Sequence, residues 1–215
     1  MTTNEWIRRV VKPLVFAACL IPLAQLLSRA VTGQLGANPI SEITHRTGDW
    51  TLRFVLITLT VTPLRRVSGW NALVRMRRML GLFAFFYGSL HFLTYLVLDQ
   101  FFDCSAIVKD VAKRPYITVG FTGFVAMVPL ALTSTTAMIR RLGGRAWGRL
   151  HRLIYLTAIA GVVHFWWLVK ADVFRPQIYA GLLACLLAFR VVVALQKRRA
   201  RWPEVFSLLL AGHRR

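Results

Sequence analysis

The sequence predicts an all-α protein that crosses a membrane repeatedly, with six helices packed as a transmembrane bundle. Two observations lead to this prediction. First, 56% of the 215 residues are hydrophobic, which is too large a share for an ordinary soluble domain. Second, the 28 Lys and Arg residues, which give the chain a net charge of +20, lie between long apolar runs instead of on one polar face. That spacing indicates membrane topology and argues against nucleic-acid binding.

The expected helices are the apolar segments 13–27, 50–64, 79–98, 116–134, 147–169 and 178–195. A membrane crossing takes about 20 residues for roughly 30 Å of hydrocarbon, so the first two segments need flanking residues to complete a span. We expect 1–12 to be a cytoplasmic N-terminus before a retained anchor. We expect 13–195 to be one six-span domain and 196–215 to be a basic cytoplasmic tail.

The distribution of basic residues predicts the orientation of the bundle. Of the 28 Lys and Arg residues, 19 lie on the side that holds both termini, 8 lie on the opposite side, and Arg190 lies within the sixth segment. Cytoplasmic loops carry the excess of Lys and Arg in membrane proteins. Both termini are therefore expected in the cytoplasm.

Three histidines lie inside the expected helices and are the candidate ligands of a metal-containing cofactor. The segment 145–170 holds His151 near its basic end and His164 much deeper, and the third segment holds His91. An ionisable side chain inside a membrane helix is costly and marks a functional site by default, and imidazole is a common axial ligand of haem iron. A histidine that is hydrogen-bonded to a neighbouring helix is the alternative. The sequence contains no CxxCH motif, so any haem would be held non-covalently.

Each of these histidines has a glycine three residues earlier: Gly88, Gly148 and Gly161. A helical side chain points back over the preceding turn, so a planar group held by the histidine would lie over that glycine. The repeated pattern predicts that these glycines clear space for a cofactor. Close packing of membrane helices is the other explanation for small residues at such positions.

Depth in the membrane predicts which histidines share a ligand. Counted from the basic ends of their helices, His91, His164 and His151 lie about 20, 26 and 6 Å deep. We therefore pair His91 with His164 as axial ligands of a b-type haem in the outer half, and place His151 at a separate cytoplasmic-side site. On a straight helix His151 and His164 point about 140° apart, so the fifth helix either faces two sides or bends, with Gly161 the expected place.

The stretches TGDWTLRFVLITLTVTPLRR, RRMLGLFAFFYGSLHFLTYL and WGRLHRLIYLTAIAGVVHFWW resemble the ferric-reductase-like transmembrane domain, and within it the bacterial MsrQ (YedZ) family. The resemblance implies an inner-membrane subunit that binds b-type haem through His91, His151 and His164, and also flavin mononucleotide (FMN). It implies electrons drawn from the quinone pool or a cytoplasmic flavin reductase. Their acceptor would be MsrP, a periplasmic molybdopterin enzyme that repairs methionine sulfoxide. The reduction of methionine sulfoxide would then take place on MsrP and not on this chain.

The same comparison leaves a second haem open, because the di-haem oxidases of the family have a second histidine where this chain has Arg77 and Arg78. These arginines are either topology signals or ligands of haem propionates, a flavin phosphate or an acidic partner. Two other functions stay open. One is direct reduction of ferric or other metal ions. The other is haem-free, proton-coupled transport, which the absence of Asp and Glu from the third to sixth segments disfavours.

Overall fold

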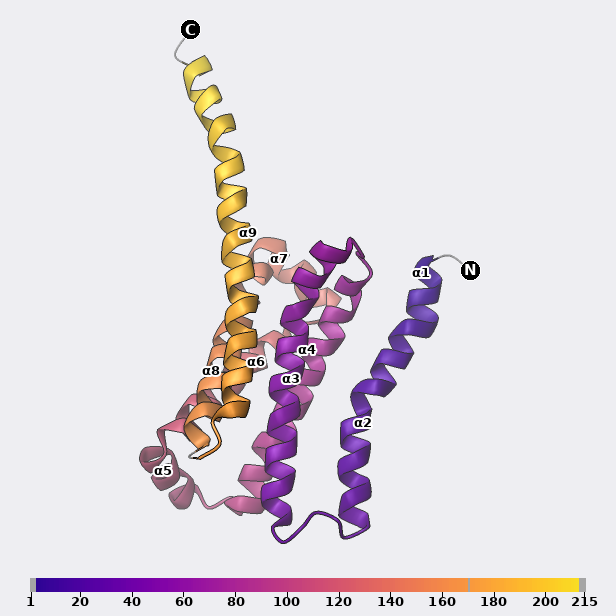
Figure 1. Ribbon diagram of the computed structural model, residues 1–215, viewed down its shortest axis with the longest axis vertical. Helices are drawn as coiled ribbons and strands as arrows, with labels where there is room; N and C mark the ends of the chain where they lie inside the picture. The colour runs from indigo at the N-terminus through magenta and orange to yellow at the C-terminus, as the bar shows by residue number, and fades with distance from the viewer. Residues whose placement is uncertain (1–2, 170, 213–215) are drawn as a thin grey trace.

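The computed structural model describes residues 3–169 and 171–212, and within these ranges every regular element is helical, as predicted (Figure 1). The elements in chain order are α1 (Thr3–Trp6), η1 (Ile7–Val11), α2 (Lys12–Val31), α3 (Pro39–Ser68), α4 (Leu73–Leu93), η2 (Thr94–Asp99), α5 (Cys104–Lys113), α6 (Pro115–Leu132), α7 (Thr136–Leu150), α8 (Leu153–Leu168) and α9 (Phe174–Gly212). Each expected segment has its helix: α2, α3, α4 with η2, α6, α8 and α9.

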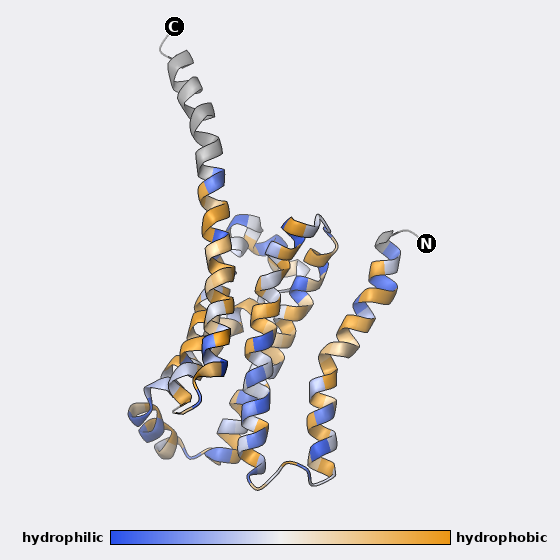
Figure 2. Ribbon diagram, viewed as in Figure 1, coloured by the Kyte–Doolittle hydropathy of each residue, from blue (hydrophilic) through white to orange (hydrophobic). Residues whose placement is uncertain are grey.

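Four stretches are long and apolar enough to cross a membrane: Ile7–Val31, Leu73–Asp99, Pro115–Leu132 and Phe174–Lys197. Helix α8 is also apolar but has only 16 residues. Helix α3 is long but carries hydrophilic residues along its first half (Figure 2), and most residues of that half are partly buried. A helix in that position tolerates polar residues because protein, and not lipid, surrounds much of it. The chain is therefore a multi-pass membrane protein.

The fifth expected helix is not continuous, which corrects the prediction for 147–169. Helix α7 ends at Leu150, a turn covers His151 and Arg152, and α8 begins at Leu153. Charged side chains disfavour entry into hydrocarbon, so the arginine-rich α7 stays outside and the span starts after Arg152. The break lies at His151 and Arg152 and not at Gly161, since α8 runs through Gly161 without interruption. His151 and His164 consequently lie on different elements.

Both termini lie at the same end of the bundle, together with the α3–α4 turn and α7 (Figure 1). We call this the basic end, because most Lys and Arg residues lie there. The α2–α3 loop, α5 and the α8–α9 connection lie at the opposite end. This arrangement has the side-to-side alternation that the basic residues predict. The expected boundaries at 12–13 and 195–196 fall inside continuous helical stretches.

The core forms where α3 packs against α4 and where α6 packs against α8. In the first pair, Phe54 stacks on both Phe83 and Tyr87, with ring centroids 5.8 and 5.3 Å apart. In the second, a Cβ added at Gly123 would lie 3.1 Å from Cβ of Ala160. Small residues at such contacts let membrane helices approach closely. Each pair is therefore a closely packed support for the side chains that project from it.

Tyr87 ties α2 to α4 through the backbone of α2. Its hydroxyl donates to the carbonyl oxygen of Cys19 (2.9 Å) and accepts from the amide of Leu23 (3.2 Å), so it inserts into one turn of α2 beside Pro22. Tyr87 is only 1% exposed. In a membrane each backbone polar group needs a partner from the protein, and this hydroxyl serves two of them.

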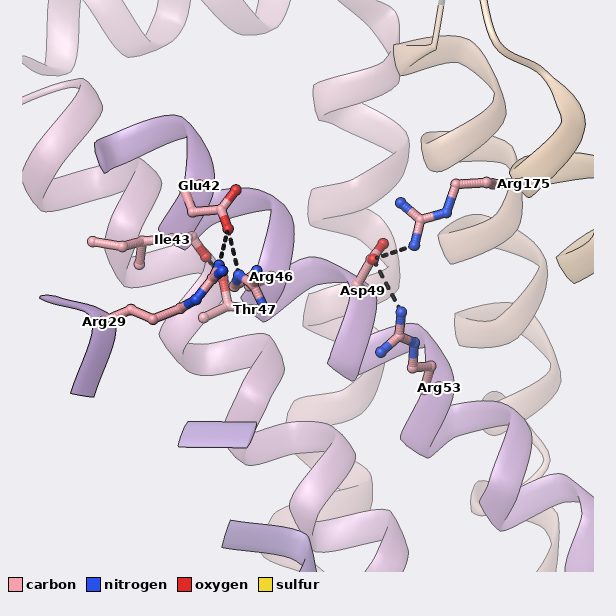
Figure 3. Close-up of polar contacts among 8 residues, drawn as sticks. All are labelled: Arg29, Glu42, Ile43, Arg46, Thr47, Asp49, Arg53 and Arg175. Carbon is pink, nitrogen blue, oxygen red and sulfur yellow. Dashed lines mark hydrogen bonds and ion pairs between the residues drawn. The ribbon is translucent and has the colours of Figure 1, made fainter. Parts of the chain in front are cut away.

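Ion pairs at the opposite end fasten α2 and α9 to α3 (Figure 3). Glu42 binds Arg29 of α2 as well as Arg46, and the Arg46 hydrogen bond lowers the pKa of the Glu42 carboxyl. Asp49 binds Arg53 at 3.3 Å and Arg175 of α9 at 3.2 Å. These side chains are partly exposed, so each ion pair alone contributes little to the free energy of folding. Together the pairs mainly fix the positions of α2 and α9 along α3.

We predict that Tyr87→Phe lowers the free energy of unfolding by about 1 kcal/mol, because the Cys19 carbonyl and Leu23 amide lose their shared partner. The thermal unfolding midpoint of the detergent-solubilised protein measures the effect. Tyr116→Phe is the matched control, because no hydrogen bond to a described residue involves its hydroxyl. Equal midpoints for wild type and Tyr87→Phe would contradict the proposed role of this hydroxyl.

Candidate functional site

The structure brings His91 and His164 together, as the depth argument predicts. Their ring centroids lie 6.1 Å apart and their planes cross at 76°. His91 lies near the end of α4 and His164 near the end of α8, so one histidine comes from each of the two packed helix pairs. Both rings lie toward the opposite end of the bundle, where their backbone partners in α3 and α6 begin.

Helix α3 holds the His91 ring. The ring atom Nδ1 lies 2.9 Å from the carbonyl oxygen of Thr44. A carbonyl can only accept, so Nδ1 carries the proton and donates, which leaves Nε2 with a free lone pair. A Cβ added at Gly48, one turn further along α3, would lie 3.0 Å from Cε1 of His91. Glycine at that position therefore makes room for the ring.

Helix α6 holds the His164 ring in the same way. Its Nδ1 donates to the carbonyl oxygen of Tyr116 at 2.7 Å, again leaving Nε2 free. A Cβ at Gly120 would lie only 2.6 Å from Nδ1 of His164. In both cases the carbonyl residue comes four positions before the glycine. One helix of each pair thus supplies the acceptor and the space, and the other helix supplies the imidazole.

This arrangement is suited to holding one metal ion between two neutral imidazoles. A histidine nitrogen lies about 2.0–2.1 Å from a bound metal, so two imidazoles on opposite sides of one ion have ring centroids about 6 Å apart. The observed separation of 6.1 Å matches that value. No hydrogen bond from a described residue reaches Nε2 of either ring. The carbonyl acceptors fix the tautomer and increase the basicity of the free nitrogen.

His151 lies apart from this pair, at the basic end. It caps α7, where its ring stacks on Trp147 with centroids 3.8 Å apart and Nδ1 lies 3.1 Å from the Trp147 carbonyl oxygen. Its Nε2 is buried and has no hydrogen bond of normal geometry in the described part of the chain, although the backbone of Leu130 lies close to the ring. A buried nitrogen without a partner costs free energy, so this atom is a candidate ligand of a second group.

Two of the three glycines that precede the histidines, Gly88 and Gly161, take part in helix contacts. A Cβ at Gly88 would lie 3.4 Å from Cγ2 of Thr51, and one at Gly161 would lie 3.3 Å from Cδ1 of Leu52. Both therefore allow α3 to approach closely. A Cβ at Gly148 would meet nothing within 4 Å. Their predicted role in clearing space for a cofactor stays a prediction.

Sequence reasoning missed the residues that hold the rings: Thr44, Gly48, Tyr116 and Gly120. Gly48 and Gly120 precede no histidine at helical spacing, and Thr44 and Tyr116 contribute only backbone atoms. Their roles depend on which helix lies next to which, and nothing local in the sequence reports that. The basic residues that the sequence did single out, Arg77 and Arg78, lie near His151. Arg77 is half-buried. Arg78 is exposed and donates a hydrogen bond to the Thr136 hydroxyl.

Comparison with known proteins identifies the family to which this chain belongs. The family model described as ferric reductase like transmembrane component matches residues 47–162, more than half of the chain. This chain belongs to that family. The matched region includes α4, α6 and most of α8, and begins one residue before Gly48.

Individual bacterial relatives narrow the assignment. A protein of Herminiimonas arsenicoxydans is 54% identical over 191 residues, which cover 88% of each chain. Relatives from Rhodospirillum rubrum (53% identical; 86% of this chain, 89% of the relative) and Ralstonia nicotianae (52%; 85% of each) are similar to the same extent. All three are named protein-methionine-sulfoxide reductase heme-binding subunit MsrQ. The chain is thus a member of the MsrQ family.

We predict that Gly120→Ala destabilises the protein by about 1–3 kcal/mol, because the added methyl group would displace the His164 ring from its carbonyl partner. Gly181→Ala is the matched control, since a Cβ there meets nothing within 4 Å. Unfolding midpoints in detergent measure both variants. Equal midpoints for Gly120→Ala and wild type would show that the ring can move aside at no cost.

Proposed function

We propose that this chain is a haem-binding membrane subunit that transfers electrons within a protein-methionine-sulfoxide reductase system. The observation that carries the proposal is the pair of imidazoles, His91 and His164, whose rings lie 6.1 Å apart with each Nδ1 bound to a carbonyl. Membership of the MsrQ family supports it, because the relatives are named as heme-binding subunits of that reductase.

The residues present fit a b-type haem. When bound, haem would supply an iron that changes oxidation state by one electron. His91 and His164 would hold this iron through their Nε2 atoms. Thr44 and Tyr116 would hold the rings in one tautomer and orientation, so that electron transfer needs no rearrangement of the ligands.

The second part of the proposal concerns the basic end. The buried Nε2 of His151 is free for a second group, and Arg77 and Arg78 lie within Coulombic range of His151. A second haem or an FMN would carry carboxylate or phosphate groups that arginines bind well. An electron would enter at this end, from the quinone pool or a cytoplasmic flavin reductase, and leave through the haem at the opposite end.

The acceptor in this proposal is the periplasmic reductase MsrP, so the repair chemistry would occur on the partner and not on this chain. Both termini would then lie in the cytoplasm of a bacterium, with the basic end inward, and the histidine pair near the periplasmic face of the inner membrane. A histidine pair close to that face suits transfer to a protein docked there. Direct reduction of a ferric ion at the same face is the nearest alternative.

Haem-free proton transport is the alternative from another class. It would require groups that exchange protons along a path, usually with carboxylates among them. His91 and His164 instead each donate to a backbone carbonyl, which takes up no proton, and no Asp or Glu lies between 79 and 98, 116 and 134, or 153 and 168. These features favour the electron carrier.

Absorption spectra of the purified protein test the proposal. We expect a Soret band and reduced bands of low-spin haem b with two histidine ligands. His91→Ala and His164→Ala should each remove the same spectral component, because both would bind one iron. His151→Ala should spare that component and either remove another or slow its reduction from the basic end.

A colourless preparation from cells supplied with haem would contradict the proposal and favour transport. Joint loss of one component in His91→Ala and His151→Ala, with His164→Ala unaffected, would contradict the pairing. Reduced protein that passes electrons to a ferric chelate but not to the methionine-sulfoxide reductase would favour the metal reductase.

A further inference from the structure

An open groove of about 560 Å³ lies between α2 and α3, toward the opposite end of the bundle. Its volume falls within the range of small-ligand sites, roughly 300–1,000 Å³. Arg46 of α3 forms one wall. The other wall is a single face of α2, with residues at i, i+3, i+4, i+7 and i+8: Ile21, Ala24, Gln25, Ser28 and Arg29. Because α2 stands at the edge of the bundle (Figure 1), the groove opens toward lipid.

The groove changes from apolar to charged along α2. Ile21 lies at its deeper end and is 52% exposed. Arg29 lies at its other end, two residues before α2 ends at Val31. The eight residues from Ile21 to Arg29 cover about 12 Å along the helix. The apolar end of the groove therefore lies in hydrocarbon and the charged end near the membrane surface, which is the order of polarity in a phospholipid of that leaflet.

Arg29 and Arg46 meet at the charged end of the groove because both bind one oxygen of Glu42 (Figure 3). Nη1 of Arg29 lies 3.1 Å from Oε1 of Glu42, and Nε of Arg46 donates to the same atom. Two positive charges thus share one negative charge, which leaves an excess of one. No other hydrogen bond to a described residue involves either guanidinium. The two arginine side chains are 41% and 38% exposed, so their remaining N–H groups are accessible.

A phosphate suits these donors, because arginines bind its oxygens through several N–H groups and the excess charge attracts an anion. Basic pockets between membrane helices bind anionic lipid headgroups in this way. We propose that the groove between α2 and α3 binds an anionic phospholipid of the leaflet at the opposite end, with its phosphate on Arg29 and Arg46. One acyl chain would follow Ile21 and Ala24 along α2.

The groove is separate from the histidine pair. A Cβ added at Gly48 would point at the His91 ring, 3.0 Å from its Cε1 atom. Arg46 precedes Gly48 by two residues, which is about 200° around the helix, so its side chain leaves α3 on the side away from His91. The lipid site therefore goes beyond the proposed function and does not depend on a bound haem.

Native mass spectrometry of the detergent-purified protein, titrated with dioleoylphosphatidylglycerol, tests the proposal. We expect Arg29→Gln and Arg46→Gln each to raise the Kd about tenfold, because each removes one charged donor to the phosphate. Arg175→Gln is the matched control. Arg175 also shares a carboxylate with another arginine at this end, through Asp49, but does not line the groove. An unchanged Kd in both test variants would overturn the proposal.

Two further ligands separate the parts of the lipid. Dioleoylglycerol has the same chains without a phosphate, and inorganic phosphate has no chains. We expect each to bind wild type at least tenfold more weakly than the phospholipid, about the loss of one charged hydrogen bond. Equal binding of dioleoylglycerol would overturn the role of the arginines, and equal binding of inorganic phosphate would overturn the role of the apolar wall.

Glu42→Gln separates the charge of the arginines from the structural effect of their ion pairs. This variant breaks the same two ion pairs but keeps both positive charges and removes the competing carboxylate. We therefore expect it to bind the phospholipid as tightly as wild type or more tightly. A Kd raised as far as in the arginine variants would overturn the proposal, because those variants would then act through the lost ion pairs.

Discussion

Hydrogen bonds from polar side chains to backbone carbonyls of neighbouring helices organise this molecule. In hydrocarbon no water can pair with a polar side chain, so the protein must supply the partner. Polar side chains inside the bundle find that partner across helices. His91 donates to Thr44, His164 to Tyr116, Tyr87 to Cys19 and Arg190 to Leu59. Each bond satisfies the side-chain donor, joins two helices and fixes the orientation of the side chain that makes it.

These hydrogen bonds explain how a largely apolar bundle can hold polar side chains in its interior. An imidazole that donates through Nδ1 is locked in one tautomer, so the same bond that stabilises the fold prepares Nε2 as a ligand. The two helix pairs repeat one design, with the carbonyl and the glycine on α3 or α6 and the histidine on α4 or α8. A site built on rigid, closely packed helices keeps its side chains in one orientation.

The two ends of the bundle differ in charge. At the opposite end, Glu42 and Asp49 neutralise arginines and register α2 and α9 against α3. At the basic end, no ion pair among the described residues involves Arg77 or Arg190, and Nε2 of His151 is buried. The contrast gives the basic end a positive field that favours anionic ligands.

The sequence by itself determined the membrane class, the alternation of sides and the pairing of His91 with His164, because apolar length, basic flanks and depth are local properties of the chain. It failed at the fifth helix, which is interrupted at His151 and Arg152, where the arginines before Leu153 disfavour continuation into the span. Only the tertiary structure decided that Gly48 and Gly120 make room for the rings, and that Arg190 donates to the Leu59 carbonyl, which Pro63 leaves without an amide donor. Those contacts join residues far apart in sequence, and they depend on which helices pack against each other.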